Sequence, residues 1–220
     1  MENNFSYAVF FDLDRTVLSL NSGNLLVREA YRGELMTTKD LINALFLSFL
    51  YKFSLRNTDL IIESMGKWVK GLPVEKIQEL SQKIVRNYLI DSIRPEIKLE
   101  IIYHKEQKAE IILLSSAINS ICDPVASHLG LNKVLCTEME SDNGILTGRP
   151  VGKFCFSGEK EIRLSKFCQE NGYNLSETWY YADSISDSPV FEIVGKQVCI
   201  NPDKKLRGIA KEKGWKVFDW

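Results

Sequence analysis

Two aspartates, one residue apart, follow the first apolar run of the chain. Residues Tyr7 to Phe11 are apolar or aromatic with no turn residue among them, which is typical of a buried strand. Asp12 and Asp14 come directly after this run, and Thr16 lies two residues further on. Carboxylates at the mouth of a buried strand are costly unless another charge offsets them, and such oxygen ligands suit magnesium. This stretch alone fits equally well with simple capping of a following helix.

Later polar residues also stand where predicted strands end. Strands over 109–114 and 178–182 are predicted from their apolar, β-branched and aromatic residues. The polar residues at these ends are Ser115, Asp183 and Asp187, and Lys160 begins a predicted helix. Taken singly, each has an ordinary role as a helix cap, a turn residue or a surface charge. Ligands of a doubly wound sheet bind at the carboxyl ends of its strands, so their joint order predicts a site for a magnesium-bound phosphate ester.

The elements that position these residues alternate between strand and helix. Strands are also predicted over 134–136, 197–200 and 216–218, the last at a sheet edge, and a hairpin turn over 142–144. Helices are predicted between them, opening at Pro95, Asn119, Ser157, Ser188 and Lys204. This alternation predicts an α/β fold with a doubly wound, mostly parallel sheet covered on both faces.

Helical patterns fill the stretch between the first strand and the second. Their predicted spans are 21–33, 37–55, 57–71 and 73–88, with caps at Asn21 and Thr37 and a first-turn Pro73. We therefore expect residues 20–90 to form an inserted small α-helical bundle. The α/β core would then consist of residues 1–19 and 91–220.

The run 41–55 is the most apolar of these helices. It is too short for a membrane span, which needs about 20 apolar residues. A helix that is apolar all round is usually buried, so we favour a helix in the core of the bundle over an interfacial membrane anchor. A pocket wall for an apolar substrate stays open.

The composition is that of a globular protein and excludes several other classes. The 220 residues are 45% hydrophobic and 26% charged, as in an ordinary globular chain, and fit one large domain or a core with an inserted smaller one. The net charge of -1 without a basic block gives no indication of a nucleic-acid partner. With only His104 and His128 available, mechanisms that need several histidines are nearly excluded.

The cysteines indicate a reducing compartment. They are odd in number and contain no CxxC pair, which favours buried thiols over a disulfide framework or a zinc site. They are Cys122, Cys136, Cys155, Cys168 and Cys199. The first residues also lack the basic start and apolar core of a signal peptide, so we expect a cytoplasmic enzyme.

The motifs, taken in order, resemble those of the haloacid dehalogenase superfamily of phosphohydrolases, in the branch similar to phosphoserine phosphatase. Asp12 to Thr16 matches the first motif, DxDxT, and Ser115 after two leucines matches the second. Lys160 fits the third motif, and the pair Asp183 and Asp187 fits the fourth, DxxxD. The match covers nearly the whole chain. It implies a Rossmann-like core with a helical cap of the C1 type.

The resemblance also implies a role for each residue. Asp12 would be the nucleophile that forms an aspartyl-phosphate, and Asp14 the general acid and base, a second acid that the dehalogenase members lack. Mg2+ would be held by Asp12, the backbone carbonyl of Asp14, and Asp183. The remaining implied roles are ordering of the metal's waters by Asp187 and phosphate binding by Ser115 and Lys160.

One departure bears on the substrate. Phosphoserine phosphatases place a glutamate soon after the first motif, whereas residues 18–24 hold no acid and Glu29 comes later. The resemblance therefore implies Mg2+-dependent hydrolysis of a small phosphorylated metabolite, without naming phosphoserine. Three alternatives stay open: phosphotransfer to an alcohol, a catalytically idle phosphate-binding or interaction module, and a lipid-phosphate enzyme that contacts membranes through 41–55. The oligomeric state is left open.

Overall fold

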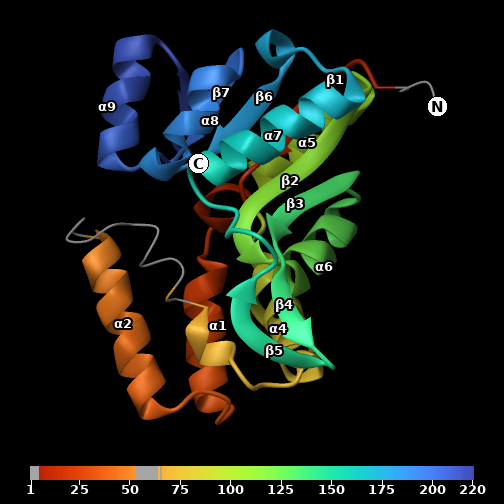
Figure 1. Cartoon of the computed structure of the whole chain (residues 1–220). Coiled ribbons are helices and arrows are strands. Elements are labelled where there is room, and N and C mark those ends of the chain that lie inside the picture. The colour runs from red at the N-terminus through yellow and green to blue at the C-terminus, as the bar shows by residue number, and fades with distance from the viewer. Residues whose placement is uncertain (1–4, 53–63, 65) are drawn as a thin grey trace.

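A six-stranded sheet forms the centre of the computed structural model, which describes residues 5–52, 64 and 66–220 (Figure 1). Its spatial order is β3-β2-β1-β6-β7-β8, and every neighbouring pair is parallel. In chain order the strands are β1 Tyr7–Phe11, β2 Ala109–Ile118, β3 Lys133–Thr137, β6 Trp179–Ala182, β7 Lys196–Ile200 and β8 Lys216–Phe218. The strand order reverses beside β1, where sheets of this kind bind ligands. The predicted doubly wound sheet is confirmed, and β8 lies at its edge as expected.

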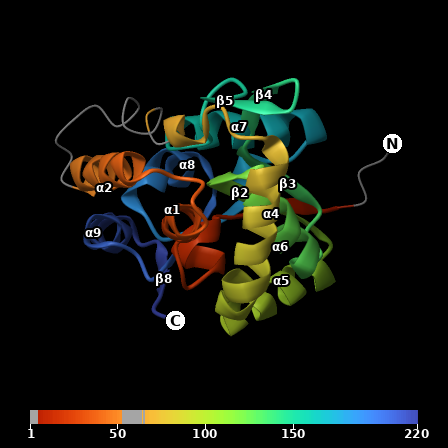
Figure 2. The same ribbon diagram turned by 90° about the horizontal axis from the view of Figure 1, so that it is seen from below.

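Helices cover both faces of the sheet (Figure 2). The α-helices that the structure describes are α1 Ser22–Arg32, α2 Thr38–Lys52, α4 Val74–Ile84, α5 Pro95–Glu106, α6 Asn119–Leu129, α7 Gly158–Asn171, α8 Ser188–Ile193 and α9 Lys204–Lys213. Side chains of α5 and α6 pack on one face, together with Phe11 and Tyr181. Side chains of α7, α8 and α9 pack on the other, together with Phe10 and Tyr180. Because successive strand residues point to opposite faces and both faces are buried, the strands are nearly continuous apolar runs.

The second strand is longer than the predicted span 109–114. It continues to Ile118, which pairs with Thr137 of β3 after a shift in register. The predicted hairpin turn joins β4 Met139–Asp142 to β5 Ile145–Pro150, which pair antiparallel outside the main sheet. Asn143 and Gly144 both have positive φ, as a two-residue hairpin turn of this type requires.

The inserted helices begin at the predicted caps. The Asn21 side chain accepts a hydrogen bond from the Asn24 backbone N–H at 2.8 Å. At the start of α2, Asp40 accepts from the Thr37 backbone N–H and Thr37 accepts from that of Asp40, which is a reciprocal capping box. The helix predicted over 57–71 begins outside the described residues.

These helices share a hydrophobic cluster with the sheet. Leu25 of α1 and Leu80 of α4 belong to the same buried cluster as Phe11 of β1 and Val125 of α6. The side-chain hydroxyls of Ser81 and Ser120 also join α4 to α6 at 2.8 Å. Helices α1 and α4 therefore pack directly on the core, and the boundaries of 20–90 as a separate domain remain a prediction.

The apolar helix α2 differs from the expectation of a helix in the core of the bundle. Leu47 and Leu50 are buried, but Ile42 and Leu45 are 62% and 61% exposed, and among the described helices α2 has its main contacts with α1, beside which it lies (Figure 1). Residues 53–55 of the predicted run lie outside the described residues. In the part of the chain that is described, no helix has the length and apolarity to cross a membrane.

Candidate active site

The first aspartate extends the central strand toward the rim of the sheet. The Asp12 backbone N–H donates to the Tyr181 carbonyl at 2.9 Å, which continues the pairing of β1 with β6 by one residue. Asp12 is only 5% exposed. Asp12 thus lies at the carboxyl end of the two central strands, as predicted from its position directly after an apolar run.

A tight turn then directs Asp14 toward the first helix. The turn spans η1 Leu13–Val17, in which Arg15 adopts a left-handed conformation with a φ of 63°. This conformation is uncommon for residues other than glycine, and the surrounding structure must enforce it. It leaves Asp14 Oδ1 2.8 Å from the backbone N–H of Ser22, at the N-terminus of α1. Helix N-termini favour carboxylates, so α1 positions this acid.

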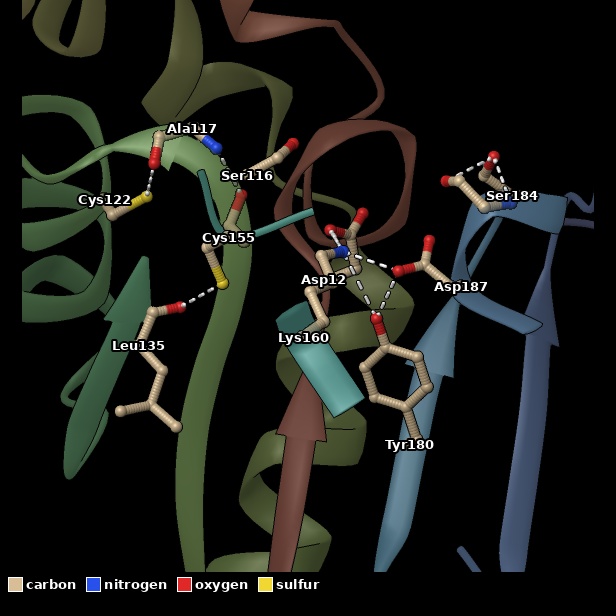
Figure 3. A network of polar contacts seen from close by, with 12 residues as sticks. Asp12, Ser116, Ala117, Cys122, Leu135, Cys155, Lys160, Tyr180, Ser184 and Asp187 are labelled. Atoms are coloured by element: carbon tan, nitrogen blue, oxygen red, sulfur yellow. Dashed lines mark hydrogen bonds and ion pairs between the residues drawn. The ribbon is translucent and has the colours of Figure 1, made fainter. Parts of the chain in front are cut away.

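Lys160 joins two of the predicted acids (Figure 3). Its Nζ lies 2.7 Å from Asp12 Oδ1 and 2.7 Å from Asp187 Oδ1. The ammonium group and both carboxylates are buried, which makes the pairing obligatory, since an unpaired buried charge is very costly. The start of α7 therefore places a cation beside the carboxylate that sequence reasoning identifies as the nucleophile.

Tyr180 is a member of this cluster that sequence reasoning missed. Its hydroxyl donates to Asp187 Oδ1 at 2.7 Å and lies 3.3 Å from Lys160 Nζ. The residue is fully buried in the apolar strand β6. A signal was present in the sequence, because the hydroxyl of a buried tyrosine usually needs a partner and Tyr180 stands three residues before Asp183.

Ser115 lies at the same edge of the sheet. The register pairs Phe11 with Leu113, so Ser115 comes two residues beyond that level on the strand next to β1. It is buried, and its Oγ accepts from the Ala117 backbone N–H at 3.1 Å. The hydroxyl proton of Ser115 is not used by that bond.

The loop that carries the other acids is held from outside by Asp203. The Asp203 backbone N–H donates to the Asp183 carbonyl at 2.8 Å, and Asp203 Oδ2 accepts from the Ile185 N–H at 2.7 Å. Asp203 Oδ1 also accepts from the first N–H groups of α9. One side chain thus caps a helix and fixes the turn between Asp183 and Asp187.

Burial and mutual repulsion dominate the electrostatics of the site. Burial raises the pKa of Asp12 to about 7, with Asp187 and Asp14 adding to the rise and Lys160 opposing it. Burial raises the pKa of Asp183 to about 8, and the charges of Asp12 and Asp187 act in the same direction. The pKa of Asp14 is also raised, by burial. The Lys160 ammonium group therefore does not offset all the carboxylates that meet here.

Comparison with known proteins identifies the family. A family model described as haloacid dehalogenase-like hydrolase matches residues 9–192, a range that contains every site residue predicted from the sequence. The chain belongs to this family. The resemblance stated from the motifs is confirmed.

Relatives of this hydrolase include proteins named as phosphatases. It is 29% identical over 222 residues to a phosphoserine phosphatase, SerB1, of Mycobacterium tuberculosis, covering 97% of this chain and 70% of the relative. It is 30% identical over 150 residues to a histidinol-phosphatase of Neisseria meningitidis, covering 66% of this chain and 68% of the relative. The prediction of an enzyme in the branch that resembles phosphoserine phosphatase is confirmed.

A solved structure shares the fold over almost the full length. The crystal structure of a protein of unknown function from Bordetella pertussis superimposes with a TM-score of 0.88 at 23% identity. The match covers 98% of this chain and 99% of that one. This likeness supports the fold assigned to the hydrolase and says nothing of its substrate.

Glu29 is held by hydrogen bonds and ion pairs to residues of the helical stretch between β1 and β2. It is 3% exposed and accepts hydrogen bonds from Arg32 at 3.0 Å and from the Tyr88 hydroxyl at 3.4 Å. Lys83 also lies 3.6 Å from its carboxylate. Glu29 thus joins α1 to α4 and the turn that follows α4.

The donor set fits a magnesium ion. In the described part of the chain, no three His, Cys, Asp or Glu side chains form a metal cage. Mg2+ does not require one, because it usually keeps several waters and takes only one or two carboxylates. Asp12 and Asp183 are two buried acids whose charges repel, and a divalent cation would offset that repulsion.

Proposed function

We propose that this hydrolase is a Mg2+-dependent phosphomonoesterase that acts on a small phosphorylated metabolite through an aspartyl-phosphate intermediate. The observation that carries the proposal is the buried Asp12 carboxylate with Lys160 Nζ at 2.7 Å and Asp14 two residues away, held by the start of α1. A binding module would not need a second acid placed in this way. The names of the phosphatase relatives agree with the assignment.

Asp12 acts as the nucleophile. One of its carboxylate oxygens attacks phosphorus, the bond from phosphorus to the ester oxygen breaks, and the leaving alcohol departs with the electron pair of that bond. Water then attacks the aspartyl-phosphate, which releases inorganic phosphate and restores the carboxylate. The first step needs Asp12 in its ionised form, which the ammonium group of Lys160 favours, and in the second step the same carboxylate is the leaving group.

Asp14 moves the protons. It donates a proton to the leaving oxygen in the first step and accepts one from the attacking water in the second. Burial raises its pKa, as suits a carboxyl group that must carry a proton near neutral pH. Its hydrogen bond from Ser22 keeps the carboxyl group in place through both steps.

Ser115 and Lys160 bind the transferring phosphoryl group. The Ser115 hydroxyl and the Lys160 ammonium group donate to phosphoryl oxygens on which charge develops. Asp12, the Asp14 backbone carbonyl and Asp183 would hold Mg2+, with Asp187 ordering its waters, and the ion would supply positive charge that offsets the repulsion between a carboxylate and a phosphate dianion. Residues 20–90 act as the cap that selects the substrate.

Glu29 does not select phosphoserine in this proposal. Its carboxylate is committed to Arg32, Lys83 and Tyr88, and residues 18–24 provide no other acid to recognise an amine. We therefore assign the chemistry and leave the alcohol part of the substrate unnamed. The buried, unpaired thiols agree with a cytoplasmic enzyme, since reduced cysteines are typical of that compartment.

A panel of phosphomonoesters tests the proposal. Phosphate release is measured with Mg2+, with EDTA, and for Asp12→Asn, with Asp142→Asn in the exposed hairpin as the matched control. We expect activity that requires both the metal and Asp12 and that Asp142→Asn retains. Release that survives loss of Asp12, or none across the panel, would overturn the proposal, and transfer of phosphate to an added alcohol would indicate a phosphotransferase.

A further inference from the structure

Tyr180 brings a hydroxyl to a position where an apolar ring would satisfy the packing. Its ring lies edge-on to that of Phe191, with centroids 5.1 Å apart, inside the cluster formed by α7, α8 and one face of the sheet. The register places it opposite Phe10 of β1. Only the hydroxyl reaches the polar cluster. Packing alone would accept phenylalanine at this position, so the role of the tyrosine lies in the contacts of its hydroxyl.

The hydroxyl has a fixed direction. Its proton goes to Asp187 Oδ1 at 2.7 Å, so that its lone pairs are left for Lys160 Nζ at 3.3 Å. The same Asp187 oxygen also accepts from Lys160 at 2.7 Å. Tyr180, Lys160 and Asp187 therefore form a closed triangle of polar contacts beside Asp12 (Figure 3).

The three N–H donors of the Lys160 ammonium group differ in the strength of their contacts. A lysine ammonium has three N–H groups, and in this structure they have three acceptors: Asp12, Asp187 and Tyr180. The contacts to the two carboxylates measure 2.7 Å, whereas the contact to the neutral hydroxyl measures 3.3 Å. The N–H that faces Tyr180 is thus the most weakly held of the three.

We propose that Tyr180 is a positioning residue that fixes Lys160 between its two carboxylates and keeps one N–H available for the phosphoryl group. When a phosphoryl oxygen arrives, this N–H exchanges the neutral hydroxyl for a charged acceptor, while the other two donors stay on Asp12 and Asp187. The hydroxyl itself stays bonded to Asp187. This inference rests on the proposed function, because it assigns a role within the same phosphoryl transfer.

The test compares Tyr180→Phe with Tyr181→Phe. Tyr181 is the next residue on β6, is equally buried and points to the opposite face, where its hydroxyl contacts Glu100 at 2.7 Å and His104 at 2.8 Å. Each variant loses one buried hydroxyl with two partners, and only the first changes the Lys160 cluster. We expect kcat to fall about 10-fold for Tyr180→Phe with KM within about twofold, because a displaced Lys160 no longer donates to the charge that develops on the phosphoryl group in the transition state. Tyr181→Phe should keep kcat within about twofold.

A structural measurement separates this inference from the proposed function. In a crystal structure of Tyr180→Phe, we expect Lys160 Nζ to have left hydrogen-bond distance of Asp12 or Asp187, whereas Tyr181→Phe keeps both contacts. If the wild type releases no phosphate but Lys160 moves in this way, the proposed function fails and the positioning role stands. The positioning role is overturned if Lys160 keeps both contacts in Tyr180→Phe, or if the two variants lose kcat equally.

Discussion

Asp12 and Lys160 are 148 residues apart in the chain, yet Nζ of the lysine lies 2.7 Å from Oδ1 of the aspartate. Both side chains are buried, and the same ammonium group contacts Asp187 at the same distance. The contact joins the end of the central strand to the start of α7. It makes the site part of the folding energetics of the hydrolase, so substitutions here change stability as well as activity.

Replacing Lys160 should destabilise the protein strongly. Lys160→Met leaves Asp12 and Asp187 buried without their cation, and breaking such a pair costs about 3–5 kcal/mol. The free energy of unfolding, measured in urea at pH 8, should fall by that amount. Lys166→Met on the same helix is the control, because that lysine is 71% exposed and its change should stay within about 0.5 kcal/mol. Equal losses for the two variants would contradict the prediction.

Replacing Asp14 should separate the two chemical steps. With 4-nitrophenyl phosphate, whose leaving group needs little protonation, Asp14→Asn should show a burst of nitrophenol followed by slow turnover. With an alkyl phosphate, kcat should fall by about 10²–10⁴, since both proton transfers are lost. Stopped-flow absorbance checks the burst, and Asp12→Asn should show none. Full activity of Asp14→Asn on the alkyl phosphate would exclude the acid and base role.

Glu29 should support stability without selecting the substrate. Burial opposes its ionisation, but the hydrogen bonds and charges of Arg32 and Arg28 outweigh burial and hold the pKa of Glu29 below its usual value. A carboxyl group with a lowered pKa stabilises the fold above its unfolded pKa and loses that contribution as the pH falls through the folded one. Glu29→Gln should therefore lower the free energy of unfolding at pH 7 by about 1–3 kcal/mol. The rank order of substrates should not change, and a new order would assign Glu29 to the cap's specificity.

Stability should depend on pH and Mg2+ together. The raised pKa values of Asp12, about 7, and Asp183, about 8, mean that the metal-free folded state binds more protons than the unfolded chain between about pH 4 and 8. Metal-free stability should therefore fall as the pH rises through this range. Adding Mg2+ should raise Tm more at pH 8 than at pH 5.5, because the metal binds the ionised carboxylates.

Asp183→Asn is the matched variant for this measurement. It removes one of the two carboxylates proposed to hold the metal and the group with the larger shift, so the pH dependence should weaken to the part that Asp12 contributes, and most of the Mg2+ effect on Tm should disappear. Asp142→Asn in the exposed hairpin should behave as the wild type. A Tm gain from Mg2+ that Asp183→Asn retains in full would place the metal elsewhere.

Much of the fold could be predicted because its signals are local. Apolar runs followed by polar residues mark β1 and β6, and the caps at Asn21 and Thr37 mark helix starts. The end of β2 could not be predicted in this way, because it depends on a partner, Thr137, on another strand. The exposure of Ile42 and Leu45 on α2 was likewise not predicted. The composition of a helix shows that it is apolar, but not how much of its surface other elements cover.

The sequence by itself determined the kind of chemistry in this hydrolase, because the types and order of Asp12, Asp14, Lys160 and Asp183 are properties of the chain alone. Only the tertiary structure decided which side chains form ion pairs and hydrogen bonds with one another. It placed the Tyr180 hydroxyl beside Lys160 and Asp187 and paired Glu29 with Arg32 of α1 and Lys83 of α4. The physical reason is that a hydrogen bond acts over about 3 Å, and sheet order and helix packing set the distances between remote residues on that scale.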